Sequence, residues 1–273
     1  MELHWDIYNP ESDAPTILVL GASLAGSSAV QWSQVAARLR SAAIVAFVDL
    51  PGHALSPVWD DADEPTLGVV ATAIMDAIRA IRDQVGNKPV IFAGLSITGA
   101  TALHLALDHS DELAGVAVVA SSAKVGDSAG WLKRAERVKD GGTAQLMEET
   151  EQRWFLPSFR ARQRGIVEVI MESVAAVDDH SYAQLCRALA VHDVRADLPD
   201  LRLPVLLIAG QRDVGTPMEA VEQMAETIPG AELKVIADVA HQVTVAAPGD
   251  VATLLLNFLE RAALPRRTAQ NDD

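Results

Sequence analysis

Three residues of the types that nucleophilic catalysis requires occur at separate points of the chain: a serine, an aspartate and a histidine. Ser96 lies in the segment GLSITG, Asp213 in GQRDVGTP and His241 in VAHQVTV. A serine hydroxyl is a weak nucleophile until a histidine accepts its proton, and a carboxylate must orient that histidine. The three residues therefore predict a site for acyl transfer, with Ser96 as nucleophile, His241 as base and Asp213 as the orienting carboxylate.

The surroundings of Ser96 are typical of a nucleophile on a sharp turn between a strand and a helix. The preceding run, VIFAG, is apolar, and the residues that follow have helical periodicity. Such a turn requires small neighbours. Gly94 fulfils this need, whereas the β-branched Thr98 is expected to crowd the turn, with Gly99 relieving the contact. The alternative is that Ser96 is only the N-cap of the helix.

Asp213 and His241 each follow a predicted strand directly. Both are therefore expected at the carboxyl edge of a parallel sheet, where the active sites of such sheets collect. The chain order Ser, Asp, His agrees with the order found for nucleophile turns of this kind. Five other histidines are interpreted as structural. His53 is expected to shape a loop near the site, His104 and His109 to lie on the helix after the nucleophile, and His180 and His192 to belong to an inserted segment.

Acyl transfer also requires two amide donors for the oxyanion that develops beside Ser96. The amide of Ile97 is one candidate, because Ile97 directly follows the nucleophile. The second is expected from the loop LGASLAGS, where Ser23 and Leu24 are both candidates. This loop has the glycine separation of a phosphate-binding loop, but it lacks the lysine that would contact the phosphates, which argues against nucleotide binding.

Short apolar runs and helical segments alternate along most of the chain. The predicted strands are Thr16–Leu20, Ile44–Val48, Val90–Ala93, Gly115–Ala120, Val205–Ala209 and Glu232–Ile236, and the predicted helices are Ala29–Arg40, Leu67–Val85, Thr98–Leu107, Met218–Ile228 and Val251–Arg261. This alternation predicts an α/β fold with a doubly wound, mostly parallel sheet.

One stretch interrupts the alternation. Residues 127–193 have helical pattern with Arg, Glu and Trp and no convincing strand. We predict a helical cap here, inserted into an α/β core of residues 1–126 and 194–264. A cap of this kind shields a site from water, although a helical insertion can equally serve packing alone. The polar residues 265–273 are predicted to be a flexible tail.

Composition excludes several classes of protein. A net charge of −15 with scattered Lys and Arg argues against a nucleic-acid partner. Cys186 is the only cysteine, which leaves no intrachain disulfide and favours a reducing compartment. The start MELHWDIYNPESD lacks a signal pattern, and the apolar stretches are too short for membrane helices, so a cytoplasmic protein with no membrane partner is expected. No metal or cofactor motif occurs, the expected partner is a small molecule, and homo-oligomer formation is left open.

The chain resembles the α/β-hydrolases over nearly its whole length, and among them the 3-oxoadipate enol-lactonases. The matching segments are ASLAGSSAVQW, DLPGHALS, GLSITG, SSAKVGDSAGWLKRAERVKDGG, RWFLPSF, CRALAVHDVRADL, IAGQRDVGTP and AHQVTVAAP. The resemblance implies an α/β-hydrolase fold with a helical cap and a triad of Ser96, Asp213 and His241. It further implies that Ser96 attacks a lactone carbonyl and that water then releases the oxo-acid.

The same resemblance directs attention to Trp131 and Arg134 in the cap segment. A guanidinium suits a two-point contact with the substrate carboxylate in a partly dry pocket, so these residues are the expected substrate-binding pair. The alternative is a solvated arginine beside a tryptophan that serves packing. Trp154 is interpreted as part of the cap's own core.

The chain departs from the family pattern at three places around the predicted site. It reads TG where the family has Gly-Gly after the residue that follows the nucleophile, ASLA where the family has Asn-Ser-Leu-Gly, and PGHA where the family has Arg-Gly-His-Gly. The reaction class is therefore better supported than the substrate. The alternatives are a general carboxylesterase, a cofactor-free haloperoxidase or carbon-carbon bond hydrolase with the same three residues, and a non-catalytic receptor, since a fold does not fix a function.

Overall fold

A seven-stranded sheet forms the centre of the protein, with strand order β1-β3-β2-β4-β5-β6-β7. The computed structural model describes residues 1–262. The strands are β1 (Trp5–Ile7), β2 (Ile17–Gly21), β3 (Ile44–Val48), β4 (Val90–Leu95), β5 (Gly115–Val119), β6 (Val205–Gly210) and β7 (Glu232–Ile236). All neighbouring strands are parallel except β1 and β3. The predicted doubly wound, mostly parallel sheet is confirmed.

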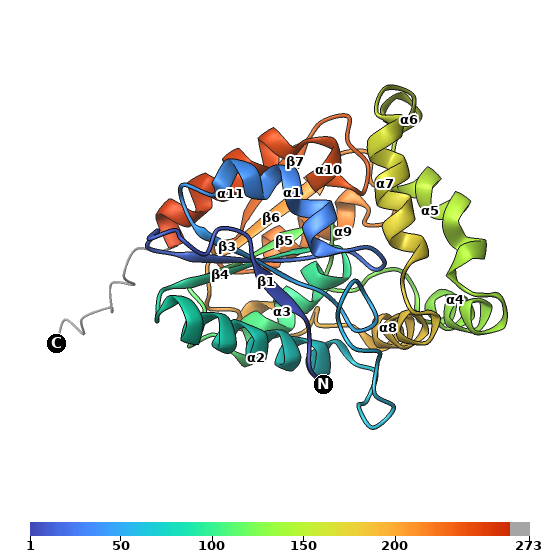
Figure 1. Ribbon diagram of the computed structural model, residues 1–273, viewed down its shortest axis with the longest axis horizontal. Helices are drawn as coiled ribbons and strands as arrows, with labels where there is room; N and C mark the ends of the chain where they lie inside the picture. The colour runs from blue at the N-terminus through green and yellow to red at the C-terminus, as the bar shows by residue number, and fades with distance from the viewer. Residues whose placement is uncertain (263–273) are drawn as a thin grey trace.

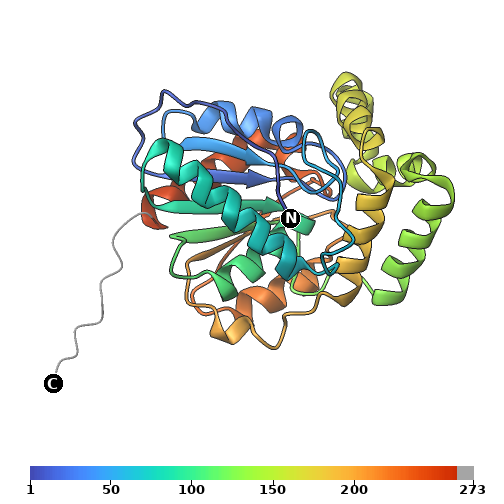
Figure 2. The same cartoon turned by 60° about the horizontal axis from the view of Figure 1, so that its bottom comes forward.

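Helices cover both faces of this sheet (Figures 1 and 2). On one face lie α1 (Ser28–Leu39), the short α10 (Val243–Ala246) and α11 (Pro248–Ala262); on the other lie α2 (Leu67–Val85), α3 (Ile97–Asp108) and α9 (Met218–Thr227). Alternate residues of a strand face opposite sides. In β2, for example, Leu18 and Leu20 pack into the cluster with α1 and α11, and Ile17 and Val19 pack into the cluster with α2 and α3.

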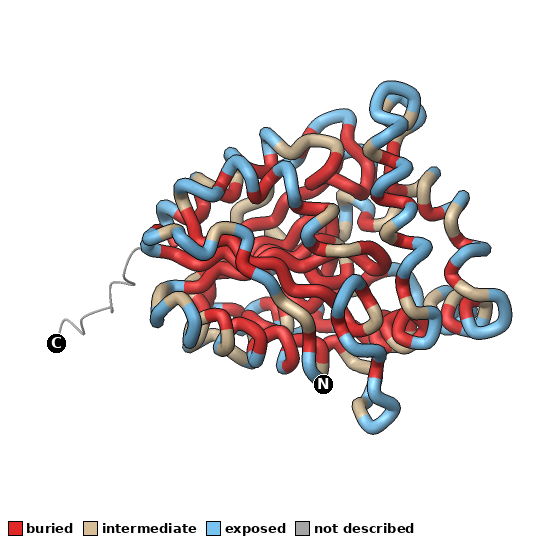
Figure 3. Tube along the Cα trace, in the orientation of Figure 1, coloured by how far each residue is buried: buried red, intermediate tan, exposed pale blue. Residues whose placement is uncertain are grey.

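Burial on both faces explains why the strands could be recognised as continuous apolar runs. Every residue of β2 to β6 is buried, and the sheet forms the red centre of Figure 3. The six predicted strands correspond to β2 to β7, and the five predicted helices correspond to α1, α2, α3, α9 and α11. Strand β1 was missed because it has only three residues at the sheet edge, where Trp5 and Asp6 are not fully buried.

The predicted cap, residues 127–193, is helical. It contains α4 (Ser128–Gly141), the 3-10 turn η1 (Thr143–Leu146), α5 (Met147–Trp154), α6 (Pro157–Arg162), α7 (Arg164–Ala175) and α8 (Asp179–Val191). These helices gather at one end of the molecule, and α4 lies along α8 (Figures 1 and 2). The predicted tail, residues 265–273, lies outside the described residues, as do residues 263 and 264 of the predicted core.

Candidate active site

Side chains from the carboxyl ends of three strands meet in a hydrogen-bonded line. Ser96 follows β4, Asp213 lies three residues after β6, and His241 lies in the loop after β7. His241 Nε2 is 2.9 Å from Ser96 Oγ, and His241 Nδ1 is 2.7 Å from Asp213 Oδ2. Because Nδ1 faces a carboxylate it donates its proton there, which leaves Nε2 free to accept the serine proton. The structure thus brings the three predicted residues together in the geometry that general-base activation requires.

Ser96 occupies a strained turn. Its φ of 59° and ψ of −115° are unfavourable for a residue with a side chain, and although it holds the N-cap position of α3, it makes no capping hydrogen bond. This argues against the N-cap alternative. The turn closes tightly: a Cβ at Gly94 would collide with the carbonyl of Thr98, and a Cβ at Gly99 would lie 2.7 Å from Cβ of Ser121. Glycine is therefore required at 94 and 99 and not at 98.

Thr98 does not crowd the turn, and the expectation that it would is wrong. Its side chain is fully buried and points toward Gly21, where a Cβ would come within 2.9 Å of Thr98 Cβ. Thr98 Oγ1 donates to the carbonyl of Ala22 at 2.8 Å and lies 3.2 Å from the carbonyl of Leu95. The missing side chain at Gly21 makes room for the threonine, and the hydroxyl connects the start of α3 to the loop after β2.

Asp213 is held as an oriented carboxylate. Its Oδ1 accepts from the amides of Gly215 at 2.7 Å and Thr216 at 3.3 Å, and its Oδ2 accepts from the Thr216 hydroxyl as well as from His241. Burial raises the pKa of this carboxyl, but the His241 ring and these hydrogen bonds outweigh burial and hold the pKa below its ordinary value. Asp213 is therefore ionised at neutral pH and fixes the orientation of the His241 ring.

Two backbone amides are available beside Ser96. Among residues 1–262, the amides of Ile97 and Leu24 have no hydrogen-bond acceptor, and Leu24 lines the same small cavity as Ser96 and His241. The amide of Ser23 is engaged, because it donates to Gln31 Oε1 at 2.9 Å. Of the two alternatives for the second donor, only the Leu24 amide is therefore free for an oxyanion.

The loop that carries Leu24 is held by hydrogen bonds to the side chains of three residues, Gln31, Gln242 and His53. Gln31 Nε2 donates to the carbonyl of Ala25 at 3.0 Å, and Gln242 Nε2, next to the base, donates to Ser23 Oγ at 3.1 Å. Ala25 has a φ of 77°, a left-handed conformation that costs an alanine about 1–2 kcal/mol. This is one of the positions where the family pattern has glycine, so the hydrogen bonds hold a strained loop in place.

His53 makes the third hydrogen bond to this loop. Its Nε2 accepts from the amide of Ala25 at 3.1 Å, and its Nδ1 donates to the carbonyl of Pro51 at 2.8 Å. Burial lowers the pKa of His53 to about 4, so the ring is neutral and its Nε2 can accept a hydrogen bond at physiological pH. In the geometry of the structure, His53 shapes the loop near the site and has no contact with Ser96.

The remaining predicted structural histidines are also engaged away from Ser96. His104 Nε2 lies 3.1 Å from His192 Nδ1, and His192 Nε2 donates to the carbonyl of Ser122 at 3.2 Å. Burial, with a smaller contribution from the neighbouring His104, lowers the pKa of His192 to about 4, although the hydrogen bond to Ser122 acts in the opposite direction. His109 lies 3.9 Å from Glu112 and His180 3.0 Å from Asp61.

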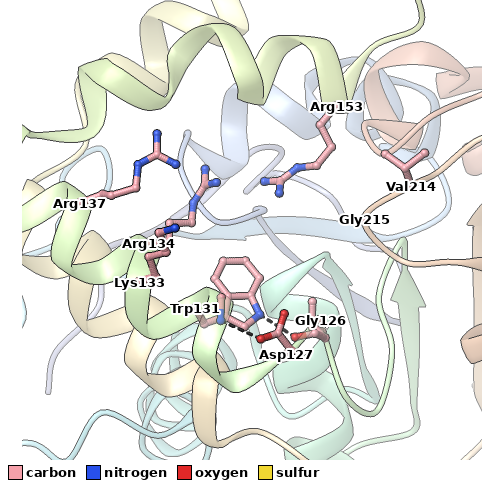
Figure 4. Close-up of a pocket in the computed structure, with 11 residues that line it drawn as sticks. Gly126, Asp127, Trp131, Lys133, Arg134, Arg137, Arg153, Val214 and Gly215 are labelled. Atoms are coloured by element: carbon pink, nitrogen blue, oxygen red, sulfur yellow. Dashed lines mark hydrogen bonds between the residues drawn. The ribbon is translucent and has the colours of Figure 1, made fainter.

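Two adjoining cavities lie between the cap and the sheet. The inner chamber, about 40 Å³, is lined by Leu24, Ser96, Trp154 and His241 among others, and the outer chamber, about 400 Å³, is lined by Asp127, Lys133, Arg137 and Val214 among others. Trp131, Arg134 and Arg153 line both chambers. Figure 4 shows these three side chains in the outer chamber. The small chamber at Ser96 therefore adjoins a wider cavity lined by residues of α4 and α5.

The predicted substrate-binding pair lies where the chambers meet. Trp131 is held by its indole nitrogen, which donates to the carbonyl of Val125 at 2.6 Å. Arg134 is already engaged: its guanidinium donates to the Tyr182 hydroxyl at 2.8 Å and to Glu149 at 2.9 Å, and its side chain is only 10% exposed. Arg134 is thus neither solvated nor free, and its role as the carboxylate partner stays a prediction that this ion pair opposes.

Arg153 is the residue of this site that sequence reasoning missed. It comes from α5 and points into the space between Arg134 and Trp131 (Figure 4). No hydrogen bond or ion pair to Arg153 occurs within residues 1–262. Burial, with the neighbouring Arg134, lowers the pKa of its guanidinium. It lies in the segment RWFLPSF beside Trp154, which is buried and whose ring centroid lies 6.5 Å from that of His241, but the sequence alone does not distinguish this arginine from the others of the cap.

Comparison with known proteins identifies the family. A sequence model described as "Alpha/beta hydrolase family" matches residues 17–254. The chain belongs to this family. The hydrolase is 31% identical to 3-oxoadipate enol-lactonase 1 of Acinetobacter baylyi, across 92% of this chain and 91% of that protein. It is 26% identical to the pimeloyl-[acyl-carrier protein] methyl ester esterase of Vibrio vulnificus, across 94% and 98%.

A solved structure has the same fold. The crystal structure of the enol-lactonase from Burkholderia xenovorans superposes with a TM-score of 0.85 at 24% identity, covering 94% of this hydrolase and 96% of that chain. The predicted α/β-hydrolase fold and the prediction of a hydrolytic enzyme are confirmed. Within residues 1–262, no helix of the hydrolase is both long enough and apolar enough to span a membrane, and no cluster of three His, Cys, Asp or Glu side chains is arranged to hold a metal ion.

Proposed function

We propose that this hydrolase cleaves small esters or lactones through a covalent acyl-enzyme, with Ser96 as nucleophile, His241 as general base and Asp213 as the orienting carboxylate. The observation that carries the proposal is the hydrogen-bonded line from Ser96 through His241 to Asp213 beside two unpaired amides. This is the set of groups that acyl transfer uses.

The chemistry follows from these contacts. Ser96 Oγ attacks the substrate carbonyl carbon as its proton passes to His241 Nε2, and the resulting oxyanion accepts hydrogen bonds from the amides of Ile97 and Leu24. As this intermediate collapses, the carbonyl re-forms and the single bond from its carbon to the alcohol or enol oxygen breaks, and His241 returns the proton to that departing oxygen. Water, deprotonated by His241, then attacks the acyl carbon; the bond to Ser96 Oγ breaks, His241 passes the proton to Ser96 Oγ, and the acid is released.

The substrate we favour is an enol-lactone of the 3-oxoadipate type. The support is the 31% identity to an enol-lactonase across 92% of this chain, together with the resemblance to enol-lactonases noted in the sequence of the cap. In such a ring the departing enol remains attached to the acyl group, and its conversion to the ketone gives the oxo-acid. A general carboxylesterase is the second candidate, because a methyl ester esterase is also among the relatives, at 26% identity.

Covalent labelling and turnover test the proposal together. A fluorophosphonate is expected to add once to the wild type and not to Ser96→Ala, while Ser33→Ala, which changes an exposed serine of α1, labels normally. Hydrolysis of p-nitrophenyl acetate is expected to fall by about 10⁶-fold in Ser96→Ala and in His241→Ala with unchanged melting temperatures. Labelling of Ser96→Ala would contradict the assignment of the nucleophile, and turnover of aryl acetates without turnover of the enol-lactone would favour the carboxylesterase.

A further inference from the structure

We propose that the outer chamber is a carboxylate-binding site and that Arg153 is the residue that selects substrates by charge. The inference rests on the proposed function and adds to it a recognition group from α5. The substrate class is a compact ester or lactone with an anionic group a short distance from the reacting carbonyl.

The first support is the state of Arg153. Its guanidinium carries five N–H donors and a permanent charge, and no described residue pairs with it. A cation that is partly removed from water without a counter-ion is costly, and a bound anion removes that cost. Because Arg153 lines both chambers, an anion paired with it lies next to the cavity that contains Ser96 and His241.

The second support is the charge of the chamber as a whole. Four cationic side chains line it, Lys133, Arg134, Arg137 and Arg153, in a chain whose net charge is −15 (Figure 4). Glu149 pairs with Arg134 and Arg137, at 2.9 and 3.3 Å. A concentration of positive charge in a cavity of an acidic protein attracts anions and raises their local concentration.

The one acidic side chain in the chamber wall does not neutralise the free cations. Asp127 is the N-cap of α4, where its Oδ1 accepts from the amide of Gly130 at 2.8 Å. No ion pair joins it to Lys133 or Arg153 within residues 1–262. Lys133 is exposed to solvent, whereas Arg153 lies deeper, beside the inner chamber. The two unpaired cations therefore lie one after the other between solvent and Ser96.

The dimensions of the chambers indicate where the anionic group lies. The inner chamber, of about 40 Å³, accepts little beyond the reacting carbonyl and its immediate neighbours, whereas the outer chamber has about 400 Å³. A substrate with its carbonyl at Ser96 must therefore extend past Trp131 into the outer chamber, and a carboxylate on that extension meets Arg153. Neutral esters react at Ser96 without this contact.

A matched pair of aryl acetates tests the charge selection. 4-Acetoxybenzoate and 4-acetoxybenzamide have the same shape and acyl group and differ in charge. Arg153→Met is expected to lower kcat/KM for 4-acetoxybenzoate by about 10- to 100-fold, the range for the loss of a hydrogen bond to a charged group, and to spare 4-acetoxybenzamide. Arg153→Lys is expected to retain most of the preference, and Arg162→Met, which removes an exposed arginine of α6, is expected to change neither rate.

A binding measurement makes the result independent of turnover. Succinate is expected to bind Ser96→Ala in calorimetry, and the double variant Ser96→Ala/Arg153→Met is expected to bind it about 10- to 100-fold more weakly. If Arg153→Met does not fold, two other measurements test the charge selection. Lys133→Met should slow only the anionic ester, and so should raising the ionic strength of the wild type from about 0.02 to 0.3 M.

The outcomes separate the two proposals. Equal losses on both esters in Arg153→Met, a preference for the neutral ester that no cation variant alters, or succinate affinity unchanged by Arg153→Met would each overturn the charge selection. A wild type that hydrolyses neither ester would instead contradict the proposed function, while the succinate measurement would still decide whether the outer chamber binds carboxylates.

Discussion

Replacing Thr98 by valine removes one hydroxyl and keeps the shape of the side chain. In the wild type this hydroxyl donates to the Ala22 carbonyl at 2.8 Å. Within residues 1–262 no other donor reaches that carbonyl, so Thr98→Val leaves a buried acceptor unpaired. The expected cost is about 1–3 kcal/mol of unfolding free energy. At about 2–4 °C per kcal/mol for a domain of this size, the melting temperature should fall by about 2–12 °C.

The same change should also slow catalysis, because Ala22 lies two residues before Leu24. Loss of one oxyanion donor typically costs about 10²–10³ in rate, and a loop that is only loosened should lose part of this, about 10-fold in kcat. Urea unfolding and p-nitrophenyl acetate hydrolysis measure the two effects. Thr98→Ser keeps the hydroxyl and should retain kcat.

Thr101→Val is the matched control on the same helix. Its hydroxyl donates to the Ile97 carbonyl at 2.9 Å, within α3, and does not contact the loop after β2. This variant should lose stability without a comparable loss of kcat. The reasoning is refuted if Thr98→Val equals the wild type in both measurements. It is also refuted if Thr98→Gly is faster than the wild type, since that result would mean that the threonine does crowd the turn.

Three further predictions follow from the geometry. Asp213→Asn should reduce kcat by about 10⁴-fold with the fold intact, because an amide cannot hold the required tautomer of the base; a near-normal rate would exclude Asp213 as the orienting group. The buried rings of His53 and His192, whose pKa values are lowered to about 4, stay neutral while the same histidines of the unfolded chain take up protons below about pH 6.5. The free energy of unfolding should therefore be complete above about pH 6.5 and fall by about 3 kcal/mol for each ring as the pH drops toward 4. Urea unfolding across this range should show a smaller loss in His192→Gln. Ala54, exposed with a φ of 48°, should be replaceable by glycine with a gain of about 0.5–1 kcal/mol, and a loss of stability in Ala54→Gly would mean that the turn is not strained.

The parts of the site that could be predicted from the sequence are those that depend on the sheet. Ser96, Asp213 and His241 each follow a strand, and the carboxyl ends of neighbouring parallel strands necessarily share an edge. Their meeting was therefore implied by the order of apolar runs along the chain, before any contact was known.

The parts that could not be predicted depend on contacts between residues far apart in the sequence. The effect of Thr98 depends on Gly21, which leaves room for it. The choice between Ser23 and Leu24 depends on the side chain of Gln31, which occupies one of the two amides. Arg153 was missed for the same reason, because only the packed cap shows that Arg134 has a counter-ion and Arg153 has none.

The groups proposed for substrate recognition and those proposed for bond cleavage come from different parts of this chain. Trp131, Arg134 and Arg153 all come from α4 and α5, one contiguous stretch, whereas Ser96, Asp213 and His241 come from the loops after β4, β6 and β7. One hydrogen bond joins this stretch to the loop of His241: the backbone amide of Gln242 donates to the carbonyl of Trp154 at 3.2 Å. If these roles hold, specificity can be changed separately from catalysis: exchanging residues 128–154 as a block, with this hydrogen bond preserved, is expected to alter which molecules are accepted while Ser96, Asp213 and His241 stay where they are.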